Sequence, residues 1–126
     1  MKGFIADIED RTEENRDFRR VIYTGPYIQL VLMSLDPDEE LGEETHENTD
    51  QFFRFEEGKG TVIIDGRETA VESDVAVIVP AGMQHNIKNT GDKPLKFYTL
   101  YAPPQHPDGT VHHTREEAEL AEHFAG

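Results

Sequence analysis

Two short stretches of this chain carry residues that could hold a metal ion. Glu44 and His46 lie two positions apart, so in an extended segment both side chains point to one face. Gln51 begins the apolar stretch that follows, and His85 comes three residues after the glycine of a Pro-Ala-Gly turn. Two imidazoles, one carboxylate and one amide oxygen can bind divalent iron, manganese, nickel or zinc. The sequence therefore predicts a metal site that leaves coordination positions open for water and substrate.

The second stretch resembles the second sequence motif of the cupin superfamily. That motif runs Gly-x5-Pro-x-Gly-x2-His-x3-Asn, and its last four named positions are Pro80, Gly82, His85 and Asn89 in this chain. Asp74 stands where the motif begins with glycine. Since aspartate is also a turn residue, this departure is compatible with a turn at the same place.

The first stretch resembles the first cupin motif, Gly-x5-His-x-His-x(3 or 4)-Glu-x6-Gly. Counting back from Gly58, Gln51 takes the glutamate position, His46 the second histidine position and Glu44 the first. A second register pairs His46 with Asn48 but leaves too few residues before Gln51. We prefer the first register, and Asn48 remains the alternative to Glu44 as the residue that completes the site. The resemblance implies a ligand set similar to that of phosphomannose-isomerase-type cupins, with the carboxylate and the amide exchanged.

The resemblance covers roughly residues 25–103 and implies an all-β fold, a double-stranded β-helix or jelly roll. The residue pattern supports this independently, because many short apolar stretches follow one another at even spacing with turn signals such as Asp65-Gly66 between them. Strands are expected over 18–23, 28–35, 51–56, 61–64, 69–71, 75–79, 85–89 and 95–101. We expect one cupin domain over 1–126, with an N-terminal arm (1–17), a barrel (about 18–103) and a C-terminal loop and helix (104–126).

The two ends of the chain are not expected to form strands of the barrel. Ile5 and Ile8 are expected to anchor a polar N-terminal arm or short helical turn. Thr114-Arg-Glu-Glu117 matches a capping box and predicts a short helix from about Arg115 to Phe124. Its expected packing stripe consists of Ala118, Leu120, Ala121 and Phe124. The remaining histidines are expected in a loop (His106) or at the surface (His112, His113 and His123).

A pocket follows from the predicted orientation of Gln51. If Gln51 points into the barrel, strand alternation places Phe53 and Phe55 on the same face, where they would wall a small and mostly apolar cavity. The face of the last strand is not determined by its sequence, so either Tyr98 or Tyr101 reaches this cavity. We take Tyr98 as the candidate acid or hydrogen-bond donor.

Composition excludes several classes of function. The net charge is −14, from 26 acidic and 12 basic residues, which disfavours nucleic acid and anionic membranes as partners. Five of the basic residues are lysine, a pattern that would also suit a halophilic source. The chain has no cysteine, which excludes disulfides and thiol catalysis. With no secretory signal or long apolar segment in the sequence, a cytoplasmic protein is expected.

Two functional hypotheses remain. The first is a metal-dependent enzyme that acts on a small polar metabolite with isomerase-like, lyase-like or dioxygenase-like chemistry, the metal acting as Lewis acid. The second is a non-catalytic module that binds or senses a small molecule in the same cavity. A homodimer is expected as well, because the apolar stretch 28–35 leaves surplus apolar surface.

Overall fold

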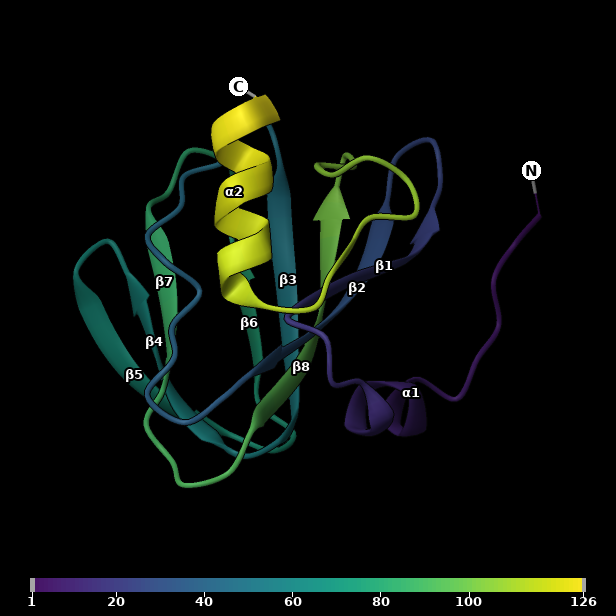
Figure 1. The fold of residues 1–126 in the computed structure, drawn as a ribbon. Coiled ribbons are helices and arrows are strands. Elements are labelled where there is room, and N and C mark those ends of the chain that lie inside the picture. Colours follow the sequence, from purple (N-terminus) through teal and green to yellow (C-terminus); the bar gives the residue numbers. More distant parts are fainter. Residues whose placement is uncertain (1, 126) are drawn as a thin grey trace.

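The computed structural model describes the backbone of residues 2–125 and the side chains of residues 2–121. This part of the chain is mostly β-structure with one short helix near each end (Figure 1). In chain order the elements are α1 (Ile8–Glu14), β1 (Arg19–Thr24), β2 (Gln29–Leu35), β3 (Asp50–Glu57), β4 (Lys59–Ile64), β5 (Arg67–Glu72), β6 (Ala76–Val79), β7 (His85–Asn89), β8 (Leu95–Ala102), β9 (Val111–His112) and α2 (Arg115–Ala125).

The strands form two antiparallel sheets. One has the order β6-β3-β8-β2-β1-β9 and the other the order β5-β4-β7. Figure 1 shows the smaller sheet on the left and the larger one running through the centre and right of the molecule. Helix α1 packs on β2, β3 and β8 of the larger sheet, and α2 packs on β9. The predicted all-β jelly roll with a short C-terminal helix is confirmed.

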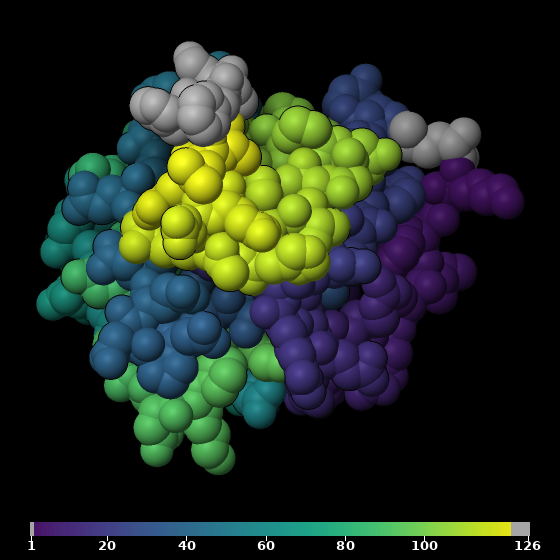
Figure 2. Space-filling view, in the orientation of Figure 1, coloured from purple at the N-terminus to yellow at the C-terminus, as the bar shows by residue number. Residues whose placement is uncertain are grey.

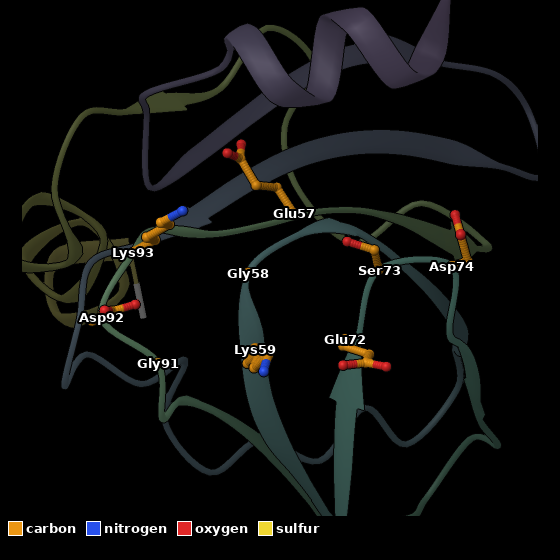
Figure 3. Close-up of a pocket in the computed structure, with 9 residues that line it drawn as sticks. All are labelled: Glu57, Gly58, Lys59, Glu72, Ser73, Asp74, Gly91, Asp92 and Lys93. Atoms are coloured by element: carbon orange, nitrogen blue, oxygen red, sulfur yellow. The ribbon is translucent and has the colours of Figure 1, made fainter.

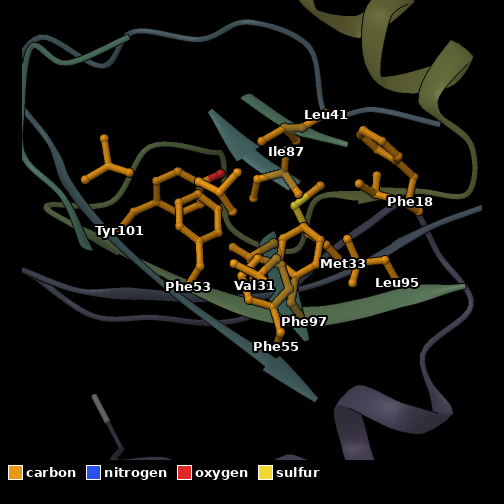
Figure 4. Packing of buried hydrophobic residues seen from close by; sticks show 14 of the residues in the cluster. Phe18, Val31, Met33, Leu41, Phe53, Phe55, Ile87, Leu95, Phe97 and Tyr101 are labelled. Atoms are coloured by element: carbon orange, nitrogen blue, oxygen red, sulfur yellow. The ribbon is translucent and has the colours of Figure 1, made fainter. Parts of the chain in front are cut away.

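The core lies between the two sheets (Figure 4). Alternate residues of β3 point inward, so Phe53 and Phe55 are fully buried. Their rings lie 5.9 and 5.2 Å from that of Phe97 on β8, at tilted angles that are favourable for aromatic pairs. Ile87 from the smaller sheet is also fully buried, so residues of both sheets complete one core.

The sequence located the regular elements well. Each expected strand is present, with ends that shift by at most two residues, and β9 is the one short strand of the described chain that was not expected. Helix α2 begins at Arg115 as predicted, and the Thr114 hydroxyl accepts a hydrogen bond from the Glu117 amide at 3.1 Å. The Glu117 carboxylate accepts from the amide of His113 rather than from that of Thr114. His123 and Phe124 lie outside the described side chains.

The predicted packing stripe of α2 was wrong in part, because Ala118 is 3% exposed but Leu120 is 51% exposed and Ala121 is exposed as well.

Two further expectations about apolar surface were wrong. Ile5 is fully exposed and does not anchor the N-terminal arm, whereas Ile8 is half-buried at the start of α1. The stretch 28–35 becomes β2, which lies inside the larger sheet, and α1 packs on it. Leu32 on β2 is therefore 1% exposed, and little of this strand remains as surplus apolar surface. None of the described helices has the length and hydropathy needed to span a membrane.

Candidate metal centre

Backbone pairing brings the two motifs together. Glu44 and His85 face each other across an isolated antiparallel bridge, in which each amide donates to the other's carbonyl at 2.9 Å. The amide of Gly82 donates to the carbonyl of His46 at 2.8 Å. Gly82 has φ +84°, in the left-handed region that glycine adopts without strain. Because residues directly opposite in an antiparallel pair point to the same face, the side chains of Glu44 and His85 converge.

Glu44, His46 and His85 form a compact cluster. Their candidate ligand atoms all lie within 4.8 Å of one another. His46 Nε2 lies 2.9 Å from Glu44 Oε2, and the two imidazole rings are 5.7 Å apart. One carboxylate and two imidazoles in this arrangement match the donor set of metal sites with open positions.

His85 presents a lone pair to the interior. Its Nδ1 lies 3.2 Å from the carbonyl of Met83, a contact in which Nδ1 is the donor and which leaves Nε2 unprotonated in the neutral ring. His85 Nε2 is buried and has no hydrogen-bond partner among the described residues. Burial also lowers the pKa of His85 and so favours the neutral form that binds metals.

Gln51 presents a second buried acceptor. Its side chain lies on the inner face of β3 and is 2% exposed. Gln51 Nε2 donates to Thr99 Oγ1 on β8 at 2.9 Å, which fixes the orientation of the amide. Gln51 Oε1 is buried and lacks a hydrogen-bond partner in the described part of the chain. Such an acceptor is costly to bury, and a bound cation would compensate it.

The Glu44 carboxylate is kept ionised by its neighbours. Burial raises its pKa, but the hydrogen bond from His46 and the positive charge of Arg19 outweigh burial and hold the pKa below its usual value. Arg19 Nη2 lies 3.8 Å from Glu44 Oε1, so the two groups interact through charge rather than through a short hydrogen bond. A carboxylate ligand is thus available without prior deprotonation.

A cavity of about 590 Å³ opens beside Glu44 and His46. Its lining includes Arg19 from β1, His112 from β9 and His106 from the loop after β8. The C-terminal segment that carries part of this lining forms the yellow and yellow-green surface of Figure 2, next to the blue segment around residues 36–49. The cavity gives a small molecule access to Glu44 and His46, whereas His85 is not part of its lining.

The loop that carries His106 is held by a buried amide. Gln29 is 0% exposed, and its Nε2 donates to the carbonyl of His106 at 2.7 Å. Gln29 Oε1 accepts from the amides of Gln105 and His106 at 3.1 and 3.0 Å. His106 Nε2 then lies 3.3 Å from the hydroxyl of Tyr101, whose ring contacts that of His46. Burial lowers the pKa of His106 to about 3, so this imidazole is neutral at pH 7.

Several of the other predicted site residues lie elsewhere. Tyr98 was the wrong choice between the two tyrosines, because the buried positions of β8 alternate through Thr99 and Tyr101 and leave Tyr98 on the outer face, beside Phe52. Phe53 contacts the His85 ring at 5.9 Å, whereas Phe55 packs against Phe97 deep in the core. Neither phenylalanine is part of the cavity lining.

The alternative register is not supported by the geometry. Asn48 is exposed in a turn, while Glu44 sits in the cluster. Two other motif positions have structural roles. Asp74 adopts φ +74°, the left-handed conformation that the motif's glycine would supply. Asn89 is buried and donates to the carbonyls of Leu35 and Lys93, so it ties neighbouring segments together.

Sequence reasoning missed three residues that line the cavity. His106 lies in a loop as predicted, whereas His112, which was expected at the surface, ends β9; both are half-buried and line the cavity. Arg19 was treated as part of a strand without a role, although its side chain is only 2% exposed. The available signal was the pair of adjacent arginines, Arg19 and Arg20, because strand alternation places one of them on the inner face.

This chain belongs to the cupin family, because the family model for the cupin domain matches residues 31–101. It is 45% identical to the uncharacterized protein YrkC of Bacillus subtilis over 96% of this chain and 68% of that protein. An uncharacterized protein of Acanthamoeba polyphaga mimivirus is 36% identical over 86% of this chain and 70% of its own. The crystal structure of BH2720 from Bacillus halodurans, 47% identical, superposes with a TM-score of 0.93 over 95% of this chain and 96% of that one.

Proposed function

We propose that this cupin binds one divalent metal ion through Glu44, His46, Gln51 and His85 and uses it as an enzyme on a small polar metabolite. One observation supports the proposal above all others. Gln51 Oε1 and His85 Nε2 are buried acceptors without a partner among the described residues; both side chains are buried on their strands, β3 and β7, and His85 belongs to the cluster with Glu44 and His46. In this proposal one cation accepts a lone pair from each of them, which compensates the cost of burying both without a partner.

The chain's own residues supply binding, orientation and a proton. When bound, the metal would act as a Lewis acid that stabilises negative charge on a substrate oxygen. Tyr101 replaces Tyr98 as the candidate proton donor, since its hydroxyl lies 3.3 Å from the neutral imidazole of His106. The hydroxyl and His106 Nε2 are hydrogen-bond partners, and the Tyr101 ring lies against that of His46, so these contacts orient Tyr101 beside the cluster. Isomerase-like, lyase-like and dioxygenase-like reactions on a small molecule all fit this arrangement.

Elemental analysis of protein purified without added metal tests the proposal. Wild type should carry nearly one equivalent of zinc, iron, manganese or nickel, and His46→Ala and His85→Ala should lose it. His113→Ala is the matched control, because His113 is exposed and bonds to Asp17 away from the cluster. A wild type that takes up no metal even after reconstitution would overturn the metal site. Bound metal without turnover of any small oxygenated metabolite would favour the binding or sensing module instead.

We also propose that two copies pair through the outer face of the larger sheet. Four apolar residues form a row across neighbouring strands of this face, in the order Leu30, Leu100, Phe52 and Ile78. Ile78 is 68% exposed, although β6 is an edge strand that a monomer would be expected to protect. Light scattering should report a dimer for wild type and a monomer for Ile78→Glu, and a monomeric wild type would contradict the pairing.

A further inference from the structure

Three of the 12 basic residues of this acidic chain line one pocket. They are Arg11 of α1, Arg16 in the loop after it and Arg20 of β1, and the pocket has a volume of about 270 Å³. Arg20 follows Arg19 in β1, and Arg19 lines the cavity beside the metal cluster. Because successive side chains of a strand point to opposite faces, the arginine pocket and that cavity lie on opposite sides of β1. A ligand of this pocket is therefore separate from the metal cluster.

Two of the three arginines have no partner of opposite charge. The side chains of Arg11 and Arg16 form no ion pair or hydrogen bond with the described residues, although the chain carries 26 acidic residues. Arg54 shows the usual situation, since it contacts the carboxylates of Glu56 and Asp74 at 3.1 and 2.9 Å. Guanidinium groups that lack a carboxylate and line one pocket are available to an external anion.

The carboxylates at the pocket do not cancel its positive charge. Asp17 Oδ2 accepts a hydrogen bond from Arg20 Nη1 at 3.0 Å, and Asp17 Oδ1 lies 2.6 Å from His113 Nδ1. Glu14, the last residue of α1, is exposed and forms no ion pair with the described residues. Three guanidiniums and two carboxylates line the pocket, so positive charge exceeds negative charge there. A concave surface of this sign attracts anions even when the whole chain is acidic.

The larger cavity in Figure 3 has the opposite balance of charge. Its volume is about 700 Å³, and it combines two lysines with four carboxylates, those of Glu57, Glu72, Asp74 and Asp92. It lies at the turns between β3 and β4 and between β5 and β6. Because carboxylates outnumber lysines, this cavity repels an anion. The size of a pocket therefore does not decide where an anion is favoured on this chain, whereas the arginines do.

The backbone around Arg16 is held in place. Asn15 is 7% exposed, its Nδ2 donates to the carbonyl of Asp17 at 2.9 Å, and its Oδ1 accepts from the amide of Asp17 at 3.2 Å. Lys96 Nζ donates to the carbonyl of Glu13 at 2.6 Å and so satisfies a carbonyl at the C-terminal end of α1. A loop fixed in this way limits the entropy lost on binding to that of the arginine side chains.

We propose that this arginine pocket, formed by Arg11, Arg16 and Arg20, binds a phosphate group, either free phosphate or that of a small phosphomonoester. The proposal does not depend on the metal function. A phosphate dianion can pair with several guanidiniums at once, whereas one guanidinium suffices for a single carboxylate. The pocket is smaller than the roughly 300 Å³ at which sites for drug-sized ligands begin, which suits a small anion. Arg11 also complements the C-terminal end of α1, but that role requires neither Arg16 nor Arg20.

Titration with inorganic phosphate, followed by nuclear magnetic resonance, tests the proposal. At matched ionic strength the side-chain Nε–H resonances of Arg11, Arg16 and Arg20 should shift saturably with phosphate and stay in place with chloride. Arg16→Gln should bind phosphate about tenfold more weakly, since one charge-assisted contact is lost. Arg67→Gln is the matched control, because Arg67 is exposed at the start of β5 and its loss changes the net charge equally. Unchanged affinity in Arg16→Gln, or no saturable shift in wild type, overturns the proposal.

Glu14→Gln gives a test of opposite sign. It removes a carboxylate from the pocket lining at an exposed position, so phosphate should bind more tightly than it does to wild type. An affinity that is unchanged or weaker contradicts the placement of the anion.

Two further probes identify the ligand. Methyl phosphate that binds more tightly than inorganic phosphate supports a phosphomonoester, and methyl phosphate that binds no better supports free phosphate. Acetate that binds as tightly as phosphate overturns the choice of phosphate. Phosphate-dependent shifts confined to residues 44, 46 and 85 would place the anion at the metal cluster and overturn the arginine pocket.

Discussion

The backbones of Glu44 and His85 are joined by a reciprocal pair of 2.9 Å hydrogen bonds that form an isolated bridge between two distant motifs. This bridge is the reason that two residues far apart in the sequence share one face of the barrel. Main-chain hydrogen bonds therefore hold Glu44 and His85 side by side, and the geometry of the cluster depends on these bonds. Substitutions that disturb the bridge should change metal affinity even when they leave every ligand in place.

Gly82 offers a test of that dependence. Gly82→Ala should destabilise the fold by about 1–2 kcal/mol, because φ is +84° and an alanine is strained there, although its Cβ has room. Metal affinity should fall as well, by about tenfold, since the Gly82 amide holds the His46 carbonyl. Urea unfolding and metal titration measure the two effects.

Gly109→Ala is the matched control for Gly82→Ala. Gly109 has φ +75° and open space around its Cβ position, but it lies in the loop before β9. It should show a similar loss of stability with unchanged metal affinity. Equal metal affinity in Gly82→Ala and wild type would mean that the hydrogen bond from Gly82 to His46 does not position the ligands.

Thr99 should fix the orientation of Gln51, the proposed fourth metal ligand. Thr99→Val removes the acceptor for Gln51 Nε2 at a fully buried position, so stability should fall by about 1–3 kcal/mol. The amide of Gln51 then loses its fixed orientation, and metal affinity should drop about 10- to 100-fold. Thr99→Ser keeps the hydroxyl and should retain the affinity of wild type. A folded Thr99→Val protein with unaltered metal affinity would remove Gln51 from the ligand set.

Strands and motif residues could be predicted because their signals are local. Each hairpin is marked by its own turn residues, and the spacing of Glu44 and His46 places them on one face of an extended segment. The structure brings these two residues and His85 together. Local patterns therefore sufficed for the strands and for the three residues that the structure brings together.

The residues that were missed or misplaced depend on long-range contacts. His106 faces the cavity because Gln29, on a distant strand, bonds to the backbone of its loop. The prediction of Tyr98 was wrong because strand alternation places Tyr98 and Tyr101 on opposite faces of β8 but does not determine which face is internal. The prediction that Ile5 anchors the arm was wrong for a related reason, since an apolar residue in a polar arm is buried only where it contacts a neighbouring apolar surface.

The side chain of Gln29 should therefore stabilise the loop that carries His106. Gln29→Leu removes the bonds to Gln105 and His106, so these amides should exchange hydrogen much faster and stability should fall by about 1–3 kcal/mol. Hydrogen exchange read by mass spectrometry measures the first effect. Gln84→Leu is the control, because Gln84 bonds to Glu43 at the surface and should leave both quantities unchanged. Unaltered hydrogen exchange at residues 105 and 106 in Gln29→Leu would show that the loop does not depend on the hydrogen bonds from Gln29.

The contact between Asp17 and His113 should make stability depend on pH. His113 Nδ1 and Asp17 Oδ1 are 2.6 Å apart. The hydrogen bond to Asp17, together with the negative charges of Asp17 and Glu117, raises the pKa of His113. Burial raises the pKa of Asp17, but hydrogen bonds from His113 and Arg20 outweigh burial and lower it. Both groups are thus charged in the folded protein over a wider pH range than in the unfolded chain.

The sign of the effect follows from the two shifts. The raised pKa of His113 contributes stability that is complete below about pH 6.5 and is lost as pH rises through the folded value. The lowered pKa of Asp17 contributes stability that is complete above about pH 3.8 and is lost as pH falls through the folded value. The unfolding free energy of wild type minus that of His113→Gln should therefore be largest between about pH 4 and 6.5. Urea unfolding from pH 3 to 9 measures this difference, and a difference that is flat across the range would mean that the contact is not formed in solution.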